Sequence, residues 1–329
     1  CSSDLNVMFM QEKIEKYLKR KVRDGVFPGC NYYIYCDSEE YIGSVGYKSL
    51  VPKKEKNNID TLYDLASLSK LVVTTVLITF LIRDKKIKLE DKVKDYLPKF
   101  IYDDVLILHL LTHSSGIKVT YDKNNIKSNN SFFTEMERSF NPGSEAIYAD
   151  INFILLGFII EKVYGDTIDN IAKKYIFDPL DMNDTYYKPK DIERCAPVEV
   201  IDDKPLRGIP SDEKARFLKG VAGHAGVYST IVDISKFLKM IMNDGYYNSK
   251  QFIDKKYIDL WFTPLFLVHD DTRRTIGWVW GKSSIICNSF CSDDSVVHTG
   301  FTGGTIFIDR AQELIFVILS NRVDRKSTR

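Results

Sequence analysis

Short strand-like runs, rich in apolar residues, lie near both ends of the chain. The runs 30–36 and 41–47 are rich in Tyr, Ile and Val, and they follow each other as the two arms of a hairpin do. Three more runs lie near the C-terminus, at 295–299, 305–309 and 314–320. Because these runs come from the two ends of the chain, we expect both ends to build one antiparallel sheet.

The middle of the chain has the pattern of helices. The run 71–82 is uncharged and mostly apolar, and it predicts a buried helix. The run 151–164 has apolar residues along its whole length and stops at Gly165, whereas 231–243 begins after Thr230 with the sequence of a capping box. The rhythm of single strands and helices that is typical of a parallel sheet is missing.

These patterns predict an α+β fold, an α/β sandwich. Its antiparallel sheet of about five strands is flanked by helices, and an all-helical lobe is inserted in the middle of the chain. We expect a single domain, 1–329. Its sheet subdomain comprises about 10–66 and 246–329, and its helical subdomain comprises about 67–245.

The composition narrows the classes of function. With 329 residues, of which 44% are hydrophobic, the chain can form one large core. A net charge of +1 gives no electrostatic support to a nucleic-acid or membrane-surface partner. No apolar run approaches the ~18 residues of a membrane span, so we expect no transmembrane segment. Two polar stretches, 118–141 and 188–219, are poorly periodic and are predicted to lie on the surface.

The cysteines give two weak indications. All six are too scattered for a zinc ribbon, and they leave a disulfide possible but not required. The start Cys1-Ser2-Ser3 would suit a lipid-anchored mature chain, or it could be an arbitrary end. We therefore expect an extracytoplasmic protein, secreted or anchored through Cys1, with a cytoplasmic location as the alternative.

A hydroxyl and an amine one helical turn apart are the first candidate for chemistry. Ser67 and Lys70 lie at the start of the apolar helix, where buried surroundings could hold the pair rigidly and exclude water. Two further Ser-x-x-Lys matches begin at Ser115, in a predicted turn, and at Ser211, in a charged stretch. The structural alternative for Ser67 and Lys70 is a helix-start serine and a solvated lysine.

Two other segments carry polar groups in a suitable context. Tyr148-Ala149-Asp150 follows a turn and precedes a helix, so the tyrosine could carry a proton to a leaving group, or the aspartate could simply cap the helix. His298-Thr299-Gly300 ends a strand, where a glycine lets a substrate lie along the strand and the Phe301 N–H can point into a cleft. The alternative for this second segment is an edge strand with a flexible turn.

Three other patterns are set aside. His109 and His113 have the spacing of half a zinc site, but no third ligand is evident, and we interpret both as structural. Gly281-Lys282-Ser283 lacks the earlier glycine of a phosphate loop. No Gly-x-Ser-x-Gly is present, which disfavours an α/β-hydrolase. We therefore predict neither a metal nor a cofactor.

In order and spacing, the three candidate segments resemble the motifs of the serine β-lactamase/penicillin-binding-protein superfamily. The likeness is greatest to its branch of class C β-lactamases, DD-peptidases and esterases. Ser67-Leu68-Ser69-Lys70 resembles the first motif, Tyr148-Ala149-Asp150 the second and His298-Thr299-Gly300 the third. The resemblance covers nearly the whole chain, from about residue 10 to residue 322.

The resemblance implies a role for each matching residue. Ser67 would attack a carbonyl group and form an acyl-enzyme, while Lys70 and Tyr148 would relay its proton. Burial of Lys70 in the apolar helix would favour the neutral amine. The backbone N–H groups of Ser67 and Phe301 would form the oxyanion hole. The substrate-binding positions would be Asp150, His298, Thr299 and Gly300.

Two positions depart from the family pattern. Asp150 stands where Asn is common, and its carboxylate would tend to keep Lys70 protonated. His298 stands where β-lactamases usually have Lys, and a neutral imidazole anchors a substrate carboxylate less well than a permanent cation does. We therefore expect weak β-lactam hydrolysis.

These features predict a serine acyl hydrolase of the D-Ala-D-Ala carboxypeptidase or D-amino-acid peptidase type, acting on cell-wall-type peptides. An esterase for small or D-alanyl esters and a weak β-lactamase are alternatives with the same chemistry. An inactive penicillin-binding or sensing module, in which Asp150 has disabled the relay, is an alternative of another class. The expected partner is a small peptide or ester substrate, such as one derived from peptidoglycan, and the oligomeric state stays open.

Overall fold

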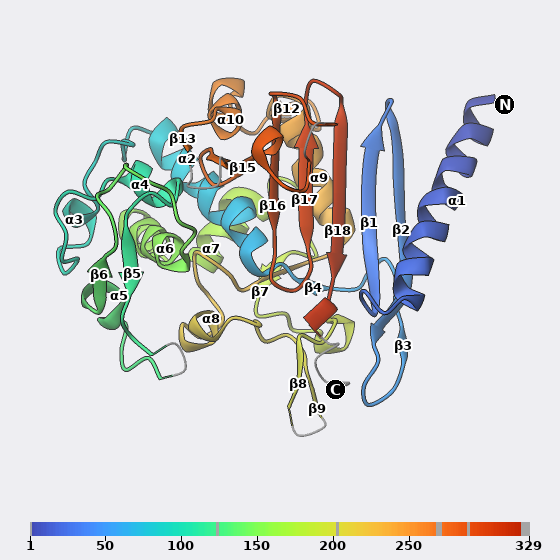
Figure 1. The fold of residues 1–329 in the computed structure, drawn as a ribbon, viewed down its shortest axis with the longest axis horizontal. Coiled ribbons are helices and arrows are strands. Elements are labelled where there is room, and N and C mark those ends of the chain that lie inside the picture. The colour runs from blue at the N-terminus through green and yellow to red at the C-terminus, as the bar shows by residue number, and fades with distance from the viewer. Residues whose placement is uncertain (1, 123–124, 202–203, 268–271, 288–289, 324–329) are drawn as a thin grey trace.

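A nine-stranded antiparallel sheet runs through the molecule in the order β13-β14-β15-β16-β17-β18-β1-β2-β3 (Figure 1). The computed structural model describes residues 2–122, 125–201, 204–267, 272–287 and 290–323. Cys1, on which the expected lipid anchor depends, lies outside these residues.

The five long strands of this sheet are the five predicted strands. They are β1 (Gly29–Cys36), β2 (Glu39–Ser49), β16 (Ser295–Thr299), β17 (Thr305–Asp309) and β18 (Leu314–Ser320). Strand β1 pairs with β18, with Tyr32 opposite Ile318, and this pairing joins the two ends of the chain. The predicted α+β fold class is therefore confirmed.

The expected number of about five strands was too low. Four strands of two residues extend the sheet: β3 (Glu55–Lys56), β13 (Phe266–Leu267), β14 (Arg273–Arg274) and β15 (Val279–Trp280). Two residues are too few to show an alternation of apolar and polar positions, so the pattern cannot reveal such strands. Smaller sheets contain β4 (Tyr63–Asp64), β7 (Tyr186–Tyr187) and β10 (Val227–Ser229); β5 (Ile117–Val119) and β6 (Met136–Arg138); β8 (Glu199–Ile201) and β9 (Lys204–Leu206); and β11 (Tyr246–Tyr247) and β12 (Lys250–Gln251).

The predicted helices of the middle segment form where their end signals place them. Helix α6 ends at Gly165, which has the left-handed φ of 75° that suits glycine. Helix α9 begins after Thr230, whose hydroxyl accepts a hydrogen bond from the Asp233 amide. The described helices are α1 (Ser2–Arg23), α2 (Val76–Arg83), α3 (Val93–Tyr96), α4 (Ile107–Leu111), α5 (Ser131–Thr134), α6 (Asp150–Tyr164), α7 (Ile168–Ala172), α8 (Glu213–Phe217), α9 (Ile231–Met242) and α10 (Lys255–Phe262), with 3₁₀ or π-helical segments η1 (Ala66–Leu68), η2 (Lys70–Thr75), η3 (Lys173–Phe177), η4 (Ile192–Arg194) and η5 (Gly281–Ser283).

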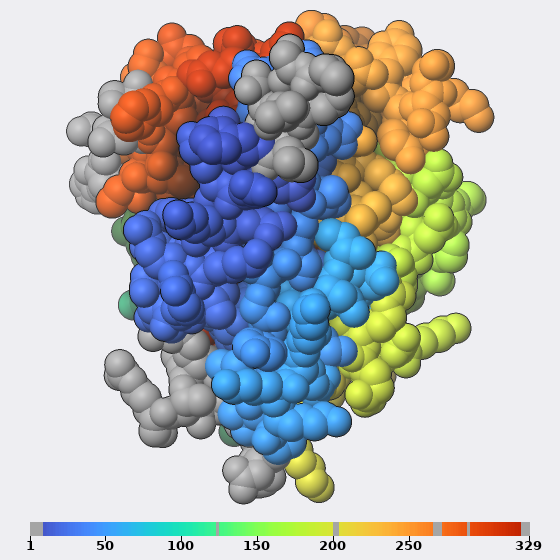
Figure 2. Space-filling model, turned by 90° about the vertical axis from the view of Figure 1, so that its right-hand side faces the viewer, coloured from blue at the N-terminus to red at the C-terminus, as the bar shows by residue number. Residues whose placement is uncertain are grey.

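The helices lie on both sides of the sheet and at one end of the molecule. Helices α2 to α6 gather on the left of Figure 1, beyond β16, and α9 packs against β1 and β18. Helix α1 packs on β2 at the opposite edge, where Leu18 lies in an apolar cluster with Tyr32, Tyr41 and Val45. Figure 2 shows this edge, with the dark-blue N-terminal helix over the lighter blue strands.

The apolar segment that begins at Ser67 is not one regular helix. A 3₁₀ turn, η1, leads into the π-helical η2, and only then does α2 follow. The Thr75 hydroxyl donates to the Lys70 carbonyl at 2.9 Å, and this side-chain bond lies within the wider π-helical turns. By length and composition, 66–83 could cross a membrane, contrary to expectation, but 83% of it is buried inside the fold, as is typical of a core helix.

The cysteines resolve one open question. Cys287 and Cys291 form a disulfide bond, which the sequence left possible. Cys30 and Cys195 are buried free thiols. Burial raises the pKa of the Cys30 thiol to about 12, so it stays protonated and unreactive at neutral pH.

Candidate active site

Ser67 lies in η1, next to a strained backbone position. The preceding Ala66 has φ 46°, in the left-handed region that residues with a side chain rarely adopt. The buried Asp64 carboxylate holds this turn, because its Oδ1 accepts a hydrogen bond from the Ala66 amide and its Oδ2 accepts one from the Ser211 amide, both at 2.8 Å. Ser67 is therefore partly exposed although the residues on either side of it are buried.

Lys70 is fully buried one turn after Ser67, and its amine makes three hydrogen bonds. It donates to Ser67 Oγ at 2.9 Å, to Asp150 Oδ1 at 2.9 Å and to the main-chain oxygen of His224 at 3.1 Å. All three acceptors are oxygen atoms, and an ammonium group has three N–H bonds to donate. The three contacts therefore match the three donors of a protonated lysine.

The electrostatics of Lys70 agree with this geometry. Burial by itself lowers the pKa of Lys70, but Tyr148 and the Asp150 carboxylate outweigh burial and raise it. In turn, burial by itself raises the pKa of the Asp150 carboxyl, but Lys70, His224 and Lys214 hold it well below its usual range. Burial thus favours the neutral amine, as expected, but the carboxylate in direct contact outweighs it, which agrees with the expectation that Asp150 keeps Lys70 protonated.

Tyr148 lies on the other side of the Ser67 hydroxyl. Its phenolic oxygen is 2.6 Å from Ser67 Oγ and 3.4 Å from Asp150 Oδ1. The ring packs on buried His113, with ring centroids 4.5 Å apart, and His113 Nδ1 accepts a hydrogen bond from the Ala149 amide at 3.2 Å. Burial lowers the pKa of His113 well below its usual value, so a neutral ring supports the loop that carries Tyr148.

The turn after β16 closes the site from a third direction. A side chain on Gly300 would place its Cβ 2.8 Å from the Leu65 carbonyl oxygen, so only glycine allows this close approach. The Thr302 hydroxyl donates to the main-chain oxygen of Asp64 at 2.8 Å. These contacts hold the β16–β17 turn against η1.

His298 is buried in this third segment and is neutral. Burial, followed by the charges of Lys70 and Arg274, lowers the pKa of His298 to about 3. With a proton on Nδ1, the ring donates to the Thr299 main-chain oxygen at 2.9 Å. A neutral imidazole cannot supply the permanent positive charge that a lysine would supply here.

Two cavities open on the two sides of Tyr148. One has a volume of about 510 Å³ and brings together Ser67, Arg274, His298, Thr299 and Phe301. The other, of about 460 Å³, extends from Tyr148 along Asp150 to Tyr121 and Lys214. The first cavity thus contains both residues predicted for the oxyanion hole, Ser67, which is also the predicted nucleophile, and Phe301.

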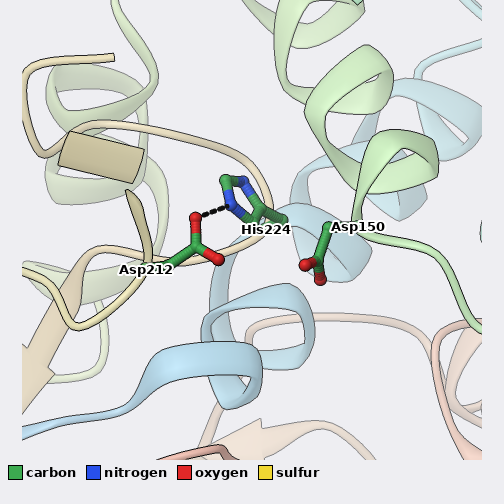
Figure 3. Close-up of side chains that lie close together, drawn as sticks. All are labelled: Asp150, Asp212 and His224. Carbon is green, nitrogen blue, oxygen red and sulfur yellow. Dashed lines mark hydrogen bonds and ion pairs between the residues drawn. The ribbon is translucent and has the colours of Figure 1, made fainter. Parts of the chain in front are cut away.

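Asp150 also belongs to a second ionic group, which is partly buried and part of which Figure 3 shows. The Lys214 Nζ lies 3.0 Å from Asp150 Oδ2 and 3.0 Å from Asp212 Oδ2. The other oxygen of Asp212 lies 2.7 Å from His224 Nε2. Ligand atoms of Asp150, Asp212 and His224 lie within 4.8 Å of one another and could hold a metal ion, but the Lys214 ammonium already bridges the two carboxylates.

Sequence reasoning selected the residues that meet at the Ser67 hydroxyl but missed their supports. Three distant segments converge here, and the rings of Tyr148 and His298 lie 6.0 Å apart. The Ser-x-x-Lys match at Ser211 does mark Lys214, but this lysine pairs with Asp150 and Asp212 and not with its own serine. The supports without a recognised role in the sequence were Asp64, Asp212, Lys214, His224 and Arg274.

Comparison with known proteins agrees with this arrangement. Residues 14–329 match the family profile described as Beta-lactamase. The chain belongs to the β-lactamase family. This serine hydrolase is 27% identical to the N-acetylmuramyl-L-alanine amidase of Bacillus subtilis (strain 168), over 94% of this chain and 80% of that protein. It is 26% identical to the putative D-alanyl-D-alanine carboxypeptidase of Escherichia coli (strain K12), over 94% of this chain and 82% of that protein. A class C β-lactamase shares its fold, with a TM-score of 0.79 and 19% identity over 97% of this chain and 93% of the other.

Proposed function

We propose that this family member is a serine carboxypeptidase that removes the C-terminal residue of D-Ala-D-Ala peptides of the cell-wall type. One observation carries the proposal: Ser67 Oγ contacts both Lys70 and Tyr148 beside a cavity that also contains Arg274. The name of the E. coli relative supports the same substrate class. Since such substrates lie outside the cytoplasm, we also propose an extracytoplasmic location.

In the proposed reaction, Ser67 Oγ attacks the carbonyl carbon of the last peptide bond. The C–N bond breaks, the peptide becomes an ester of Ser67, and the C-terminal amino acid leaves as an amine. The Ser67 and Phe301 amides would stabilise the oxyanion, where loss of one donor typically costs about 3 kcal/mol. Water then attacks the ester, which releases the shortened peptide and restores the serine hydroxyl.

We assign the transfer of the Ser67 proton to Tyr148. The phenolic oxygen is 2.6 Å from Ser67 Oγ, so it can pass a proton between this oxygen and the leaving nitrogen. Lys70 is an ammonium at neutral pH and has no lone pair with which to accept a proton. Its role in the proposal is to stabilise the negative charge that develops as the proton moves.

Arg274 is the residue that we assign to the substrate carboxylate. Its guanidinium lies 5.6 Å from the Tyr148 ring centroid and lines the cavity beside Ser67. A guanidinium can bind a carboxylate through two hydrogen bonds, each worth about 1.5–3 kcal/mol with charged groups. Arg274→Gln should therefore lower kcat/KM by about 10- to 100-fold for a peptide that ends in a free carboxylate.

The substrate pair and the neighbouring arginine make this test specific. The same peptide with a C-terminal amide should be cleaved slowly by the native protein, and Arg274→Gln should change that rate little. Arg273→Gln, at the adjacent exposed position, should leave both rates unchanged. Equal losses for the acid and the amide would contradict a carboxylate-binding role for Arg274.

Hydrolysis of the β-lactam nitrocefin should be weak. His298, which borders the cavity, is neutral, whereas β-lactamases usually have at this position a lysine that anchors the substrate carboxylate. We therefore expect kcat/KM at least about 10²-fold below that of a dedicated β-lactamase. Absorbance of the opened lactam measures this rate directly. Turnover at the level of a dedicated enzyme would show that the substrate is a β-lactam rather than a peptide.

An esterase with the same acyl-enzyme chemistry is the second candidate. The apolar lining of the Ser67 cavity, which includes Val279, Val297 and Phe301, suits an apolar acyl group. Parallel assays with p-nitrophenyl esters and a D-Ala-D-Ala peptide distinguish the two enzymes by their ratio of kcat/KM. A sensing module would instead acylate Ser67 once and show no turnover.

A further inference from the structure

We infer that Lys214 is a positioning residue for the Lys70 ammonium and acts on it through the Asp150 carboxylate. The inference rests on the proposed function, because the proposed function assigns Ser67 and Lys70 their catalytic roles. Lys214 does not line the cavity beside Ser67, and its ion pairs are with Asp150 and Asp212, so it reaches Lys70 directly through Asp150 and indirectly through Asp212 and His224.

The contacts form a closed ring of five residues. Asp150 uses one oxygen for each lysine, Oδ1 for Lys70 at 2.9 Å and Oδ2 for Lys214 at 3.0 Å. Lys214 also forms an ion pair with Asp212 at 3.0 Å, and Asp212 contacts the His224 ring at 2.7 Å. The main-chain oxygen of His224 returns to Lys70 at 3.1 Å. Because both carboxylate oxygens are engaged, Asp150 cannot rotate away from Lys70 without breaking the ring.

The elements that carry these residues are separate in the sequence. Lys70 begins η2 and Asp150 begins α6, whereas Lys214 lies in the first turn of α8. Asp212 caps α8 by accepting a hydrogen bond from the Ala215 amide at 2.9 Å. The ring therefore ties three helix starts together directly beneath the Ser67 hydroxyl.

Within the ring, two lysines face two carboxylates. The Lys214 side chain is only 8% exposed, so water cannot easily replace it. Without Lys214, both carboxylates would act on the single remaining ammonium, and Lys70 would hold its proton to higher pH. The ionisable groups that interact with Lys70 are Tyr148, Asp150, His113 and His298, and Arg274 acts on the same two histidines. Those that interact with Lys214 are Asp150, Asp212 and Tyr121, and His224 pairs with Asp212.

Two substitutions with opposite charge effects test this inference. Lys214→Met removes a cation, whereas Asp212→Asn removes an anion and keeps a good helix cap. The readout is kcat/KM on one ester substrate as a function of pH, with the thermal unfolding temperature measured in parallel. We expect Lys214→Met to lower kcat/KM at neutral pH by about 10- to 100-fold, because Asp150 can then rotate away from Lys70. The alkaline limb of the profile, where Lys70 loses its proton, should move to higher pH.

The remaining variants make the result decisive. Asp212→Asn should move the same limb to lower pH, Lys214→Arg should restore most of the activity, and exposed Lys204→Met should behave as the native protein does. A native profile in Lys214→Met, or a loss of rate and unfolding temperature with no shift of the limb, would overturn the inference. If Lys214→Met does not fold, the direction of the shift in Asp212→Asn decides the question. Continued turnover by Ser67→Ala would instead refute the proposed function, so the two failures are distinguishable.

Discussion

Replacement of Ser67 by alanine is expected to lower kcat/KM for the peptide and ester substrates by at least about 10⁴-fold. The hydroxyl is the group on which the Lys70 and Tyr148 hydrogen bonds converge, and no acyl-enzyme can form at this position without it. Intact mass after treatment with a fluorophosphonate should show one added label on the native protein and none on Ser67→Ala. The fold should persist, since the residue is small and partly exposed.

The other Ser-x-x-Lys serines provide the matched control for this experiment. Ser211→Ala removes the hydroxyl of a second match, whose lysine is held by Asp150 and Asp212 and is not paired with its own serine. It should keep the label and the turnover. A label that survives Ser67→Ala and disappears in Ser211→Ala would move the nucleophile to the α8 turn and refute the proposed site.

The long elements of this fold are predictable because their signals are local. Strands such as β17 and β18 are runs of five residues or more that are rich in β-branched and apolar residues, and the end of α6 is marked by a glycine with the left-handed φ that suits this residue. The edge strands β13 to β15 carry no comparable signal, because their two residues pair only where the neighbouring strand presents its backbone.

The residues of the site likewise divide into those that sequence spacing predicts and those that only the folded chain brings together. Ser67 and Lys70 are neighbours on one helical segment, so their spacing alone predicts that they meet. The ring through Lys214 cannot be predicted in this way, since 64 residues separate Asp150 from Lys214 and only the folded chain brings them together. The sequence indicated two opposite effects on the protonation of Lys70, burial in an apolar segment and a carboxylate at position 150, but only the folded chain shows the direct contact by which the carboxylate outweighs burial.

The second large effect is expected from Lys70→Met, which should lower kcat/KM by about 10³-fold. The ammonium donates to Ser67 Oγ and separates it from the Asp150 carboxylate. Without this cation, negative charge on the serine oxygen would develop beside an unscreened carboxylate, so deprotonation of Ser67 becomes unfavourable. The rate of Ser67 acylation, followed by intact mass, measures this step apart from hydrolysis of the ester.

Lys70→Arg distinguishes the two roles that a lysine could have here. If Lys70 acts as a cation, as its three donated hydrogen bonds indicate, an arginine should retain at least about 10-fold more activity than methionine. If Lys70 instead accepts the proton, both variants should be equally inactive, since a guanidinium stays charged. Exposed Lys19→Met is the control for loss of a lysine, because Lys19 pairs with Glu15 on α1, away from the Ser67 site. The unfolding temperature of Lys70→Arg must match that of the native protein for the comparison to count, because the site is fully buried and a misfitting arginine would lower both activity and stability.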